Sequence, residues 1–317
     1  QQIMSTHERN FPIVYIIVLN WNRSDDTIAC LDSLNKITIS DYKMKVVLVD
    51  NGSSDDSVQR LKKYNAGNMN IKLIEKTDNL GFAAGNNVGI KYALKNNADY
   101  VFILNNDTLV DKDIVNKLLK AAVRYKDAGI FTPKIYFARG FEFHKKYKKN
   151  ELGKIIWSAG GEIDWNNVYG KNAGVDEVDN GQFGKDRETD FATGAAMFVR
   201  SKVFIKYRLF DERYFMYFED VDLCFRYKRS GGKIIYVGSA ILWHKVAQSS
   251  GIGSDLNDYY ITRNRLLFGM GYAPLRTKLA LYKESVKFLM YGRPMQKKGV
   301  IDFYTAKFGR GTIENKL

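Results

Sequence analysis

Carboxylate side chains gather in one short, strongly aromatic segment of the chain. Residues 210–226 read Phe-Asp-Glu-Arg-Tyr-Phe-Met-Tyr-Phe-Glu-Asp-Val-Asp-Leu-Cys-Phe-Arg, so that Glu219, Asp220 and Asp222 follow a run of aromatic rings. Aromatic surroundings exclude water, which raises the pKa of a carboxyl group toward the range of a useful general base. A structural interpretation is open as well, in which the first two acids favour a helix N-terminus and Asp222 pairs with Arg226 one turn later. That alternative leaves the earlier acids and the dense aromatic residues unexplained.

Two further polar groups follow apolar runs that predict strands. The triplet Asn105-Asn106-Asp107 comes directly after one such run, and His244 comes after another. A carboxylate and an imidazole can hold a divalent cation, and Mg²⁺ in proteins commonly bridges one or two carboxylates to phosphate oxygens. Each signal is weak alone, because polar residues are common in turns and a lone histidine is more often structural than a ligand.

Two loops have the composition of a nucleotide site. Asp50 ends the apolar run 45–49, where a carboxylate can accept a hydrogen bond from a nucleobase or a ribose hydroxyl; a turn followed by a helix cap explains it equally well. Segment 78–89 carries glycines between a predicted strand and a predicted helix, which would let a phosphate approach the helix N-terminus. It matches neither Gly-x-Gly-x-x-Gly nor the P-loop pattern, so we expect neither a dinucleotide-binding fold nor a P-loop kinase or ATPase.

The candidate site residues follow segments that predict strands alternating with helices. In the first half of the chain, strands are predicted at 13–19, 45–49, 71–74 and 100–104, and helices at 24–34, 53–61, 84–95 and 113–125. Such alternation predicts an α/β fold with a mostly parallel sheet, whose ligands bind at the carboxyl ends of the strands. Periodicity fades over residues 139–188, which we expect to be long surface loops that hold acceptor specificity. A strand at 191–199, a helix near 220–229 and strands at 233–237 and 240–243 follow.

The composition narrows the class of partner. Of 317 residues, 45% are apolar and 26% charged, and the net charge is +14, which favours an anionic partner such as a nucleotide, a diphosphate or an anionic lipid. No zinc, RNP or helix-turn-helix pattern accompanies this charge, so we expect no nucleic-acid partner. The two cysteines, Cys30 and Cys224, lie far apart and fit a reducing compartment. No apolar run approaches the ~20 residues that span a bilayer, and we expect a cytoplasmic protein.

The order of the motifs resembles family 2 glycosyltransferases of the GT-A fold, from Val14 to about Phe268. The matching segments are 17–22, 49–53, 79–87, 105–107, 193–195, 210–212, 219–222 and His244. One such motif is a weak signal, whereas the ordered set is a strong one. The Leu-Asn-Asn-Asp form of the triplet is most similar to the rhamnosyltransferase-like branch, whose donors are dTDP-sugars. Two positions depart from the family: Asn105 replaces the first Asp of an Asp-x-Asp metal motif, and Arg208 stands where similar sequences often have Gly.

The resemblance implies an inverting hexosyltransferase of cell-envelope polysaccharide synthesis. It would move a sugar from a nucleotide-diphosphate donor, with dTDP-rhamnose favoured and a UDP-sugar next, to a hydroxyl of a glycan or a lipid-linked saccharide. Asp220 would be the general base, and Asp107 and His244 would bind Mg²⁺ or Mn²⁺. The implied nucleotide-sugar-binding residues are Asn20, Asp50, Gly81, Asn87, Asn105, Asn106, Thr193, Gly194 and Glu219. A sugar-nucleotide nucleotidyltransferase and a catalytically inactive carbohydrate-binding relative are the alternatives.

We expect a GT-A catalytic domain over residues 10–250, divided into a nucleotide-binding half (about 10–137) and an acceptor half (138–250). A basic helical extension, 251–317, would follow. In it, apolar residues recur at helical spacing with basic residues between them: Leu275, Leu279, Tyr282, Val286 and Leu289, with Arg276, Lys278, Lys283 and Lys287. This stripe either packs on the catalytic domain or rests on anionic lipid at the inner face of the cell membrane. Arg263 and Asn264 either reach the diphosphate or occupy a solvated helix face. The sequence indicates no oligomeric state.

Overall fold

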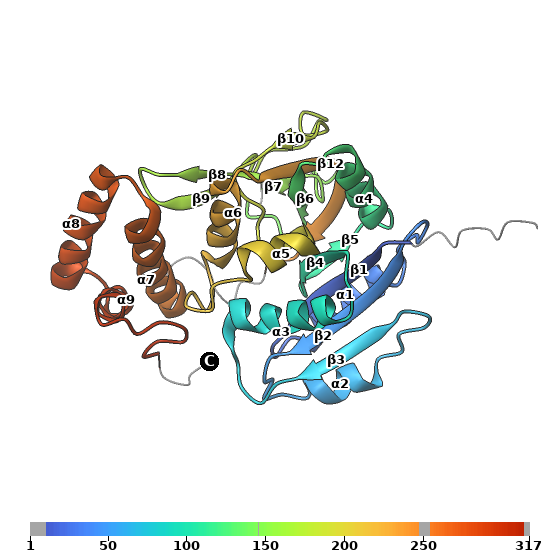
Figure 1. Cartoon of the computed structure of the whole chain (residues 1–317), viewed down its shortest axis with the longest axis horizontal. Coiled ribbons are helices and arrows are strands. Elements are labelled where there is room, and N and C mark those ends of the chain that lie inside the picture. Colours follow the sequence, from blue (N-terminus) through green and yellow to red (C-terminus); the bar gives the residue numbers. More distant parts are fainter. Residues whose placement is uncertain (1–10, 145, 247–253, 314–317) are drawn as a thin grey trace, which may run out of the picture.

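A central β-sheet with helices on both faces forms the body of the protein (Figure 1). The computed structural model describes residues 11–144, 146–246 and 254–313. The expected division between residues 250 and 251 lies outside the described residues, as do residue 10 and Lys145.

The strands are β1 (Ile13–Asn20), β2 (Lys43–Asp50), β3 (Ile71–Glu75), β4 (Tyr100–Asn105), β5 (Thr108–Val110), β6 (Ala128–Phe137), β7 (Ile156–Ser158), β8 (Gly161–Asp164), β9 (Tyr169–Asn172), β10 (Arg187–Glu188), β11 (Ala196–Arg200) and β12 (Lys233–His244). The helices are α1 (Ser24–Leu34), α2 (Ser57–Lys63), α3 (Gly81–Lys95), α4 (Ile114–Arg124), α5 (Ser201–Tyr207), α6 (Glu219–Arg229), α7 (Asp255–Tyr272), α8 (Leu275–Tyr291) and α9 (Pro294–Tyr304).

The first half of the sheet is parallel, as the alternating pattern predicts. Strand order along the main path is β10-β12-β6-β11-β4-β1-β2-β3, and the four strands from β4 to β3 run parallel. Side chains of β1 alternate between two cores: Tyr15 and Ile17 face α3, whereas Val14, Ile16 and Val18 face α1 and α4. Burial on both faces explains why this strand is a continuous apolar run.

The second half of the sheet is mixed. β11 runs antiparallel to both β4 and β6, and β12 runs parallel to β6. The predicted strands 233–237 and 240–243 are one strand, β12, with a register shift between Val237 and Ile241, where Gly238 and Ser239 interrupt the apolar run. Residues 139–188 are not loops alone but include β7 to β10, whose two to four residues each are too few to show a period.

The last three helices form one end of the molecule, on the side away from β1–β3 (Figure 1). Leu266 and Phe268 of α7 and Leu281 of α8 belong to the same hydrophobic core as Phe218, the residue before α6. The predicted apolar stripe of α8 does not pack against the rest of the protein, because its side chains are 37–74% exposed and Thr277, Leu281 and Ser285 face inward instead. Among the described helices, none combines the length and hydropathy that a bilayer crossing needs.

Candidate active site

The carboxyl end of β4 brings distant segments of the chain together. Asn105 is the last residue of β4, and its amide donates a hydrogen bond to the carbonyl of Ala195 (3.0 Å). Because β11 runs antiparallel to β4 and pairs Ala196 with Leu104, the residues just before β11 must lie at this end. Thr193 and Gly194 are thereby placed beside the Asn105-Asn106-Asp107 turn.

Asp107 and His244 are 137 residues apart in sequence and meet through a strand pairing. The short β5 lies antiparallel to the end of β12, with Thr108 opposite His244. This register puts Nε2 of His244 3.0 Å from Oδ1 of Asp107, and both side chains are largely buried. Trp157 contacts the His244 ring edge-on, at 4.6 Å between ring centroids. His244 Nδ1 is buried and has no hydrogen-bond partner among the described residues.

A strained aromatic turn presents Glu219 and Asp220 at the start of α6. Phe215, Tyr217 and Phe218 have φ values of +63°, +67° and +73°, which residues other than glycine rarely adopt. Tyr217 and Phe218 immediately precede the helix, so its first two residues are aimed by this turn. Carboxylates at this position are also favoured by the helix dipole.

Burial changes the acidity of both carboxyl groups. Burial is the main reason that the pKa of Glu219 is raised well above its ordinary value, and the charge of Asp220 adds to the effect. The pKa of Asp220 is also raised by burial, although hydrogen bonds from the amides of Gly194 (2.8 Å) and Val221 (2.8 Å) oppose the shift. Burial therefore favours the neutral form of both neighbouring carboxyl groups, and the two amides partly offset this effect at Asp220. Asp222 instead pairs with Arg226 (2.7 Å), as the structural interpretation of this acid predicts.

The expectations for Arg263 and Asn264 are both wrong: neither residue lies on a solvated face or lines the cavity described below. Both are fully buried in α7. Nδ2 of Asn264 lies 2.8–3.0 Å from the carbonyl oxygens of Tyr214, Met216 and Tyr217. Arg263 donates to the carbonyls of Arg213 (3.1 Å), Tyr214 (3.0 Å) and Gly309 (2.7 Å). These side chains hold the strained turn, and because their partners are backbone carbonyls no motif in the sequence announces the role.

One cavity of about 450 Å³ collects most of the predicted site residues. Those that line it are Asn105, Asp107, Thr193, Gly194, Glu219, Asp220 and His244. Sequence reasoning missed most of its remaining wall, which is largely apolar and includes the aromatic and amide side chains of Phe82, Trp157, Tyr169, Asn172, Phe191 and Tyr217. Trp157, Tyr169 and Asn172 come from the 139–188 region, and their residue types, aromatic and amide, are the signal that could have identified them. Side chains of this kind suit the apolar faces and hydroxyl groups of a sugar.

Asn20, Asp50 and Asn106 form a buried network next to the cavity rather than part of its wall. Asn20 donates to Asp50 (2.7 Å), and the hydroxyl of Ser53 donates to the same carboxylate oxygen (2.6 Å). Thr27 links the other side, since it donates to Asn20 (2.7 Å) and accepts from Asn106 (2.9 Å). The network joins the carboxyl ends of β1 and β2 to the turn that carries Asp107.

Gly81 and Asn87 are not among the residues that line the cavity, although Phe82 of the same segment is, and their expected contact with the nucleotide sugar stays a prediction. A Cβ atom at Gly81 would lie 2.5 Å from the ring of Phe215, so this glycine makes room for the strained turn. The amides of Gly81 and Ala83 at the start of α3 already donate to Asn79 Oδ1 (2.8 Å) and the carbonyl of Phe215 (3.0 Å), which leaves them unavailable to a phosphate. The carboxamide of Asn87 exchanges hydrogen bonds with the backbone of Phe210 (2.9 and 3.1 Å).

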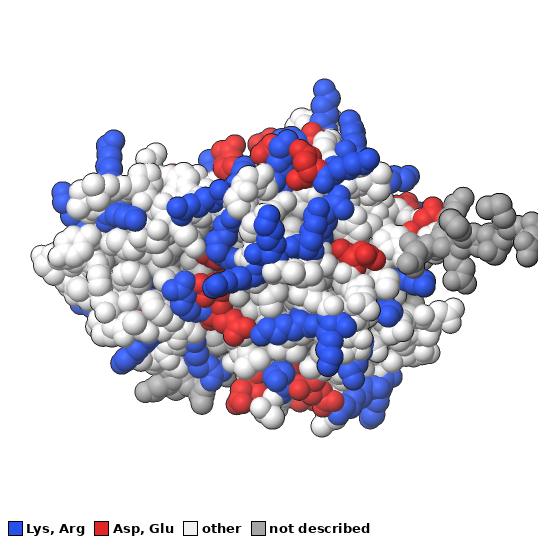
Figure 2. Space-filling model, in the orientation of Figure 1, with Lys and Arg blue, Asp and Glu red and all other residues white. Residues whose placement is uncertain are grey.

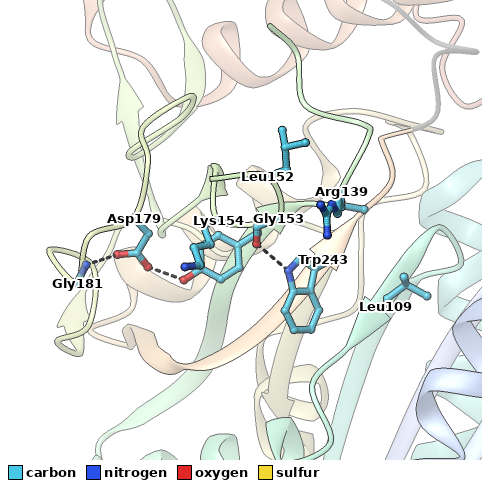
Figure 3. A pocket seen from close by; sticks show the side chains of 10 residues that line it. Leu109, Arg139, Leu152, Gly153, Lys154, Asp179, Gly181 and Trp243 are labelled. Carbon is cyan, nitrogen blue, oxygen red and sulfur yellow. Dashed lines mark hydrogen bonds between the residues drawn. The ribbon is translucent and has the colours of Figure 1, made fainter. Parts of the chain in front are cut away.

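A second cavity, of about 660 Å³, has a different character (Figure 3). Leu109, Arg139, Leu152 and Trp243 are among its lining residues, and the indole of Trp243 donates to the carbonyl of Gly153 (2.9 Å). Burial raises the pKa of its carboxylate, Asp179, but hydrogen bonds from Lys134 and Tyr136 outweigh that effect and the net shift is downward. A carboxylate that is held charged and paired is a poor general base. The smaller cavity is therefore the candidate active site.

The fold is that of the GT-A glycosyltransferases. The structure is similar to GalNAc-T7 solved with UDP, GalNAc and Mn²⁺, with a TM-score of 0.61 and 15% identity over 94% of this chain. The match spans 59% of the GalNAc-T7 chain. It is also similar to the mannosyltransferase PcManGT of Pyrobaculum calidifontis, solved with GDP-Man and Mn²⁺, with a TM-score of 0.53 and 15% identity over 99% of this chain and 80% of that one.

The sequence assigns the chain to a family within this class. The family model "Glycosyl transferase family 2" matches residues 15–207, and the chain belongs to that family. Its relatives include the N-acetylglucosaminyl-diphospho-decaprenol L-rhamnosyltransferase of Mycobacterium tuberculosis, 28% identical over 66% of this chain and 68% of that protein. The rhamnosyltransferase WbbL of Escherichia coli is 27% identical over 71% of this chain and 80% of that protein. The protein is a glycosyltransferase with rhamnosyltransferase-like relatives.

Proposed function

We propose that the protein transfers a sugar, with inversion, from a nucleotide-diphosphate donor to a hydroxyl group of a glycan or lipid-linked saccharide. The observation that carries the proposal is the single cavity lined by Asp220, Asp107 and His244. The names of the relatives favour rhamnose as the transferred sugar and a diphospho-polyprenol-linked saccharide as acceptor. The family resemblance favours dTDP-rhamnose as the donor, with a UDP-sugar next. The corresponding process is the synthesis of cell-envelope polysaccharide.

Asp220 is the proposed general base. The amides of Gly194 and Val221 fix its carboxylate, and burial raises the pKa of the neighbouring Glu219, which favours the uncharged form of that side chain. As the acceptor oxygen attacks the anomeric carbon, its proton passes to Asp220, and the bond from that carbon to the diphosphate oxygen breaks. The nucleoside diphosphate leaves with the bonding electron pair, and attack from the opposite face inverts the anomeric configuration. General-base catalysis of this kind contributes roughly 10²–10⁴-fold in rate.

Asp107 and His244 are the proposed ligands of Mg²⁺ or Mn²⁺. Nε2 of His244 and Oδ1 of Asp107 lie 3.0 Å apart and both residues line the cavity, so this oxygen and nitrogen pair would suit such an ion. No group of three or more His, Cys, Asp or Glu residues suited to a metal occurs among the described residues, so donor phosphate oxygens and water would complete the coordination. When bound, the ion would act as a Lewis acid that neutralises charge on the departing diphosphate.

The remaining nucleotide-sugar-binding roles are proposed for the polar groups of the cavity wall and for the network beside it. Asn105, Thr193, Gly194 and Glu219 line the cavity, which supports a role for them in holding the donor sugar and its phosphates. We propose that Asp50, with Asn20 and Asn106, holds the carboxyl ends of β1 and β2 in position to face the nucleobase of the donor. We propose that residues 10–250 are the catalytic domain, with halves 10–137 and 138–250, and that 251–317 extend it. A cytoplasmic location, at the inner face of the cell membrane, would bring the enzyme to a lipid-linked acceptor.

The direct test is a transfer assay with the purified chain. The protein is incubated with Mn²⁺ or Mg²⁺, with dTDP-rhamnose, UDP-sugars or GDP-sugars, and with a short-chain diphospho-prenol saccharide. We expect release of dTDP and a product heavier by one deoxyhexose in mass spectrometry. Pyrophosphate release would point to a nucleotidyltransferase, and saccharide binding without turnover of any donor would point to an inactive relative. Either result would contradict the proposal.

A further inference from the structure

An apolar stripe runs along the outward face of α8. We define the α8 stripe as Leu275, Leu279, Tyr282, Val286 and Leu289, whose exposed fractions are 74%, 55%, 55%, 37% and 41%. The spacings of four, three, four and three residues place these side chains in one line along a helix. The face that packs inward carries Thr277, Leu281 and Ser285 instead. A helix of a water-soluble domain normally has the opposite arrangement, with its apolar stripe inward.

The apolar surface continues beyond this line. Met290 and Tyr291 follow on α8, and Ile301 and Tyr304 lie on α9, with exposed fractions of 49–79%. The hydroxyl of Tyr304 lies 2.8 Å from that of Ser285, which joins the two helices. Of the sixteen exposed large apolar residues found in the described ranges, nine fall between 275 and 304. Concentration of this kind marks an interaction surface rather than scattered exposure.

The charges around the stripe are almost all positive. Helix α8 carries four bases, Arg276, Lys278, Lys283 and Lys287, and one acid, Glu284. At 100° per residue, Arg276, Lys283 and Lys287 fall on one flank of the stripe and Lys278 falls on the other. Glu284 lies away from the stripe and forms an ion pair with Arg265 of α7 (2.6 Å). In Figure 2 the end of the molecule that α8 forms is mostly white with Lys and Arg around it, and no Asp or Glu is visible there.

We propose that the α8 stripe lies on the surface of an anionic lipid bilayer, with its apolar side chains at the acyl boundary and its basic flanks among the headgroups. Apolar burial together with basic residues near anionic lipid is the combination that holds an interfacial helix. A second copy of the chain would bring four bases against four bases, so charge disfavours that occupant.

This orientation connects the bilayer to the active site. Helix α7 carries Ile261 in the wall of the cavity and Arg265 in the ion pair with α8. A bilayer under α8 is thus one helix away from the cavity. The inference deepens the proposed function and rests on it only for the lipid-linked acceptor, because binding to a bilayer and sugar transfer are measured separately.

The test is flotation of the full chain with vesicles of phosphatidylcholine alone or mixed with phosphatidylglycerol. We expect flotation with the anionic vesicles only. The double variant Leu279→Ser/Val286→Ser should lower the bound-to-free ratio at least tenfold. Lys283→Gln/Lys287→Gln should lower it several-fold and weaken its dependence on salt. The matched control is Val123→Ser/Ile205→Ser, which changes residues 68% and 73% exposed on α4 and α5 and should float like the wild type.

Three outcomes would overturn the proposal. They are a wild type that does not float with anionic vesicles, an α8 stripe variant that floats as well as the wild type, and a dimer in lipid-free light scattering that the stripe variant abolishes. Circular dichroism melting confirms that the variants are folded. Transfer to a water-soluble acceptor should be unchanged in the α8 stripe variant. A failure of membrane binding is therefore distinguishable from a failure of the proposed transferase activity.

Discussion

The backbone amide of Gly194 donates a 2.8 Å hydrogen bond to Oδ2 of Asp220. The amide belongs to the segment that leads into β11 beside the end of β4, whereas the carboxylate belongs to the first turn of α6. This bond connects the proposed base to the carboxyl end of β4, where Asn105 and Asp107 lie. The other carboxylate oxygen, Oδ1, accepts a hydrogen bond from the amide of Val221. The carboxylate is thus oriented before any acceptor arrives, which is the condition for efficient proton transfer.

Substitution of the two neighbouring acids should have unequal effects. Asp220→Asn removes the proposed base and should lower kcat by roughly 10²–10⁴-fold, with little change in the melting temperature. Glu219→Gln imitates the neutral acid that burial favours and should retain kcat to within about tenfold. Steady-state rates of nucleoside diphosphate release measure both. Equal losses in the two variants would refute the assignment of the base.

The rate should depend on pH through the same carboxylate. Asp220 accepts a proton only when charged, and burial raises its pKa. The rate must therefore fall as the pH drops through that raised pKa, at a higher pH than an ordinary aspartate would give. A profile of kcat against pH checks this, provided that the fold is intact throughout the range. In Asp220→Asn the residual rate should no longer fall at low pH. If the same fall persists in this variant, a group other than Asp220 is responsible for it.

Removal of the divalent cation should stop transfer. EDTA should abolish activity, and added Mn²⁺ or Mg²⁺ should restore it. Asp107→Ala and His244→Ala should each weaken cation affinity by about 10–100-fold, measured directly by electron paramagnetic resonance of free Mn²⁺ in the presence of donor. Asp179→Ala, at the second cavity, is the matched control and should leave Mn²⁺ affinity unchanged. Full activity in EDTA would show that the Asp107–His244 pair is a hydrogen bond and nothing more.

Asn264 should affect turnover without touching substrate. Asn264→Ala removes the donor shared by three carbonyls of the strained turn and leaves them buried, which should cost about 1–3 kcal/mol of unfolding free energy. The released turn would no longer aim Asp220, so kcat should fall more than the donor KM rises. Denaturant unfolding and steady-state kinetics give the two readouts. A stability loss with unchanged kcat would limit Asn264 to a structural role.

Arg208 offers a gain in stability. It has φ +69° and ψ 167°, a region that only glycine occupies readily. Arg208→Gly should relieve strain of about 1–3 kcal/mol, reduced by the greater chain entropy of glycine when unfolded. Chemical denaturation should therefore show a higher midpoint. A lower midpoint would mean that interactions of the arginine side chain outweigh the strain.

The sequence predicts the parallel half of the fold well, because strands buried on both faces leave continuous apolar runs such as β1. It could not predict why Asp107 meets His244, since their meeting depends on β5, a strand of three residues without a recognisable period. Gly81 shows a different limit. Its place between a strand and a helix is as predicted, but the sequence does not reveal that the ring of Phe215 packs against the space a side chain would take. The role of a side chain that binds backbone carbonyls, such as Arg263, cannot be recognised in the sequence, because every residue has a carbonyl group.

The position of Asp220 depends on residues that follow it by more than forty places. Arg263 and Asn264 hold the turn before α6, and Arg263 also binds the carbonyl of Gly309, close to the last described residue. Chimaeras built to exchange acceptor preference between relatives must therefore keep the turn and its α7 partners from the same parent. A junction placed just after β12 would separate Asp220, the proposed general base, from the side chains that hold the turn before it.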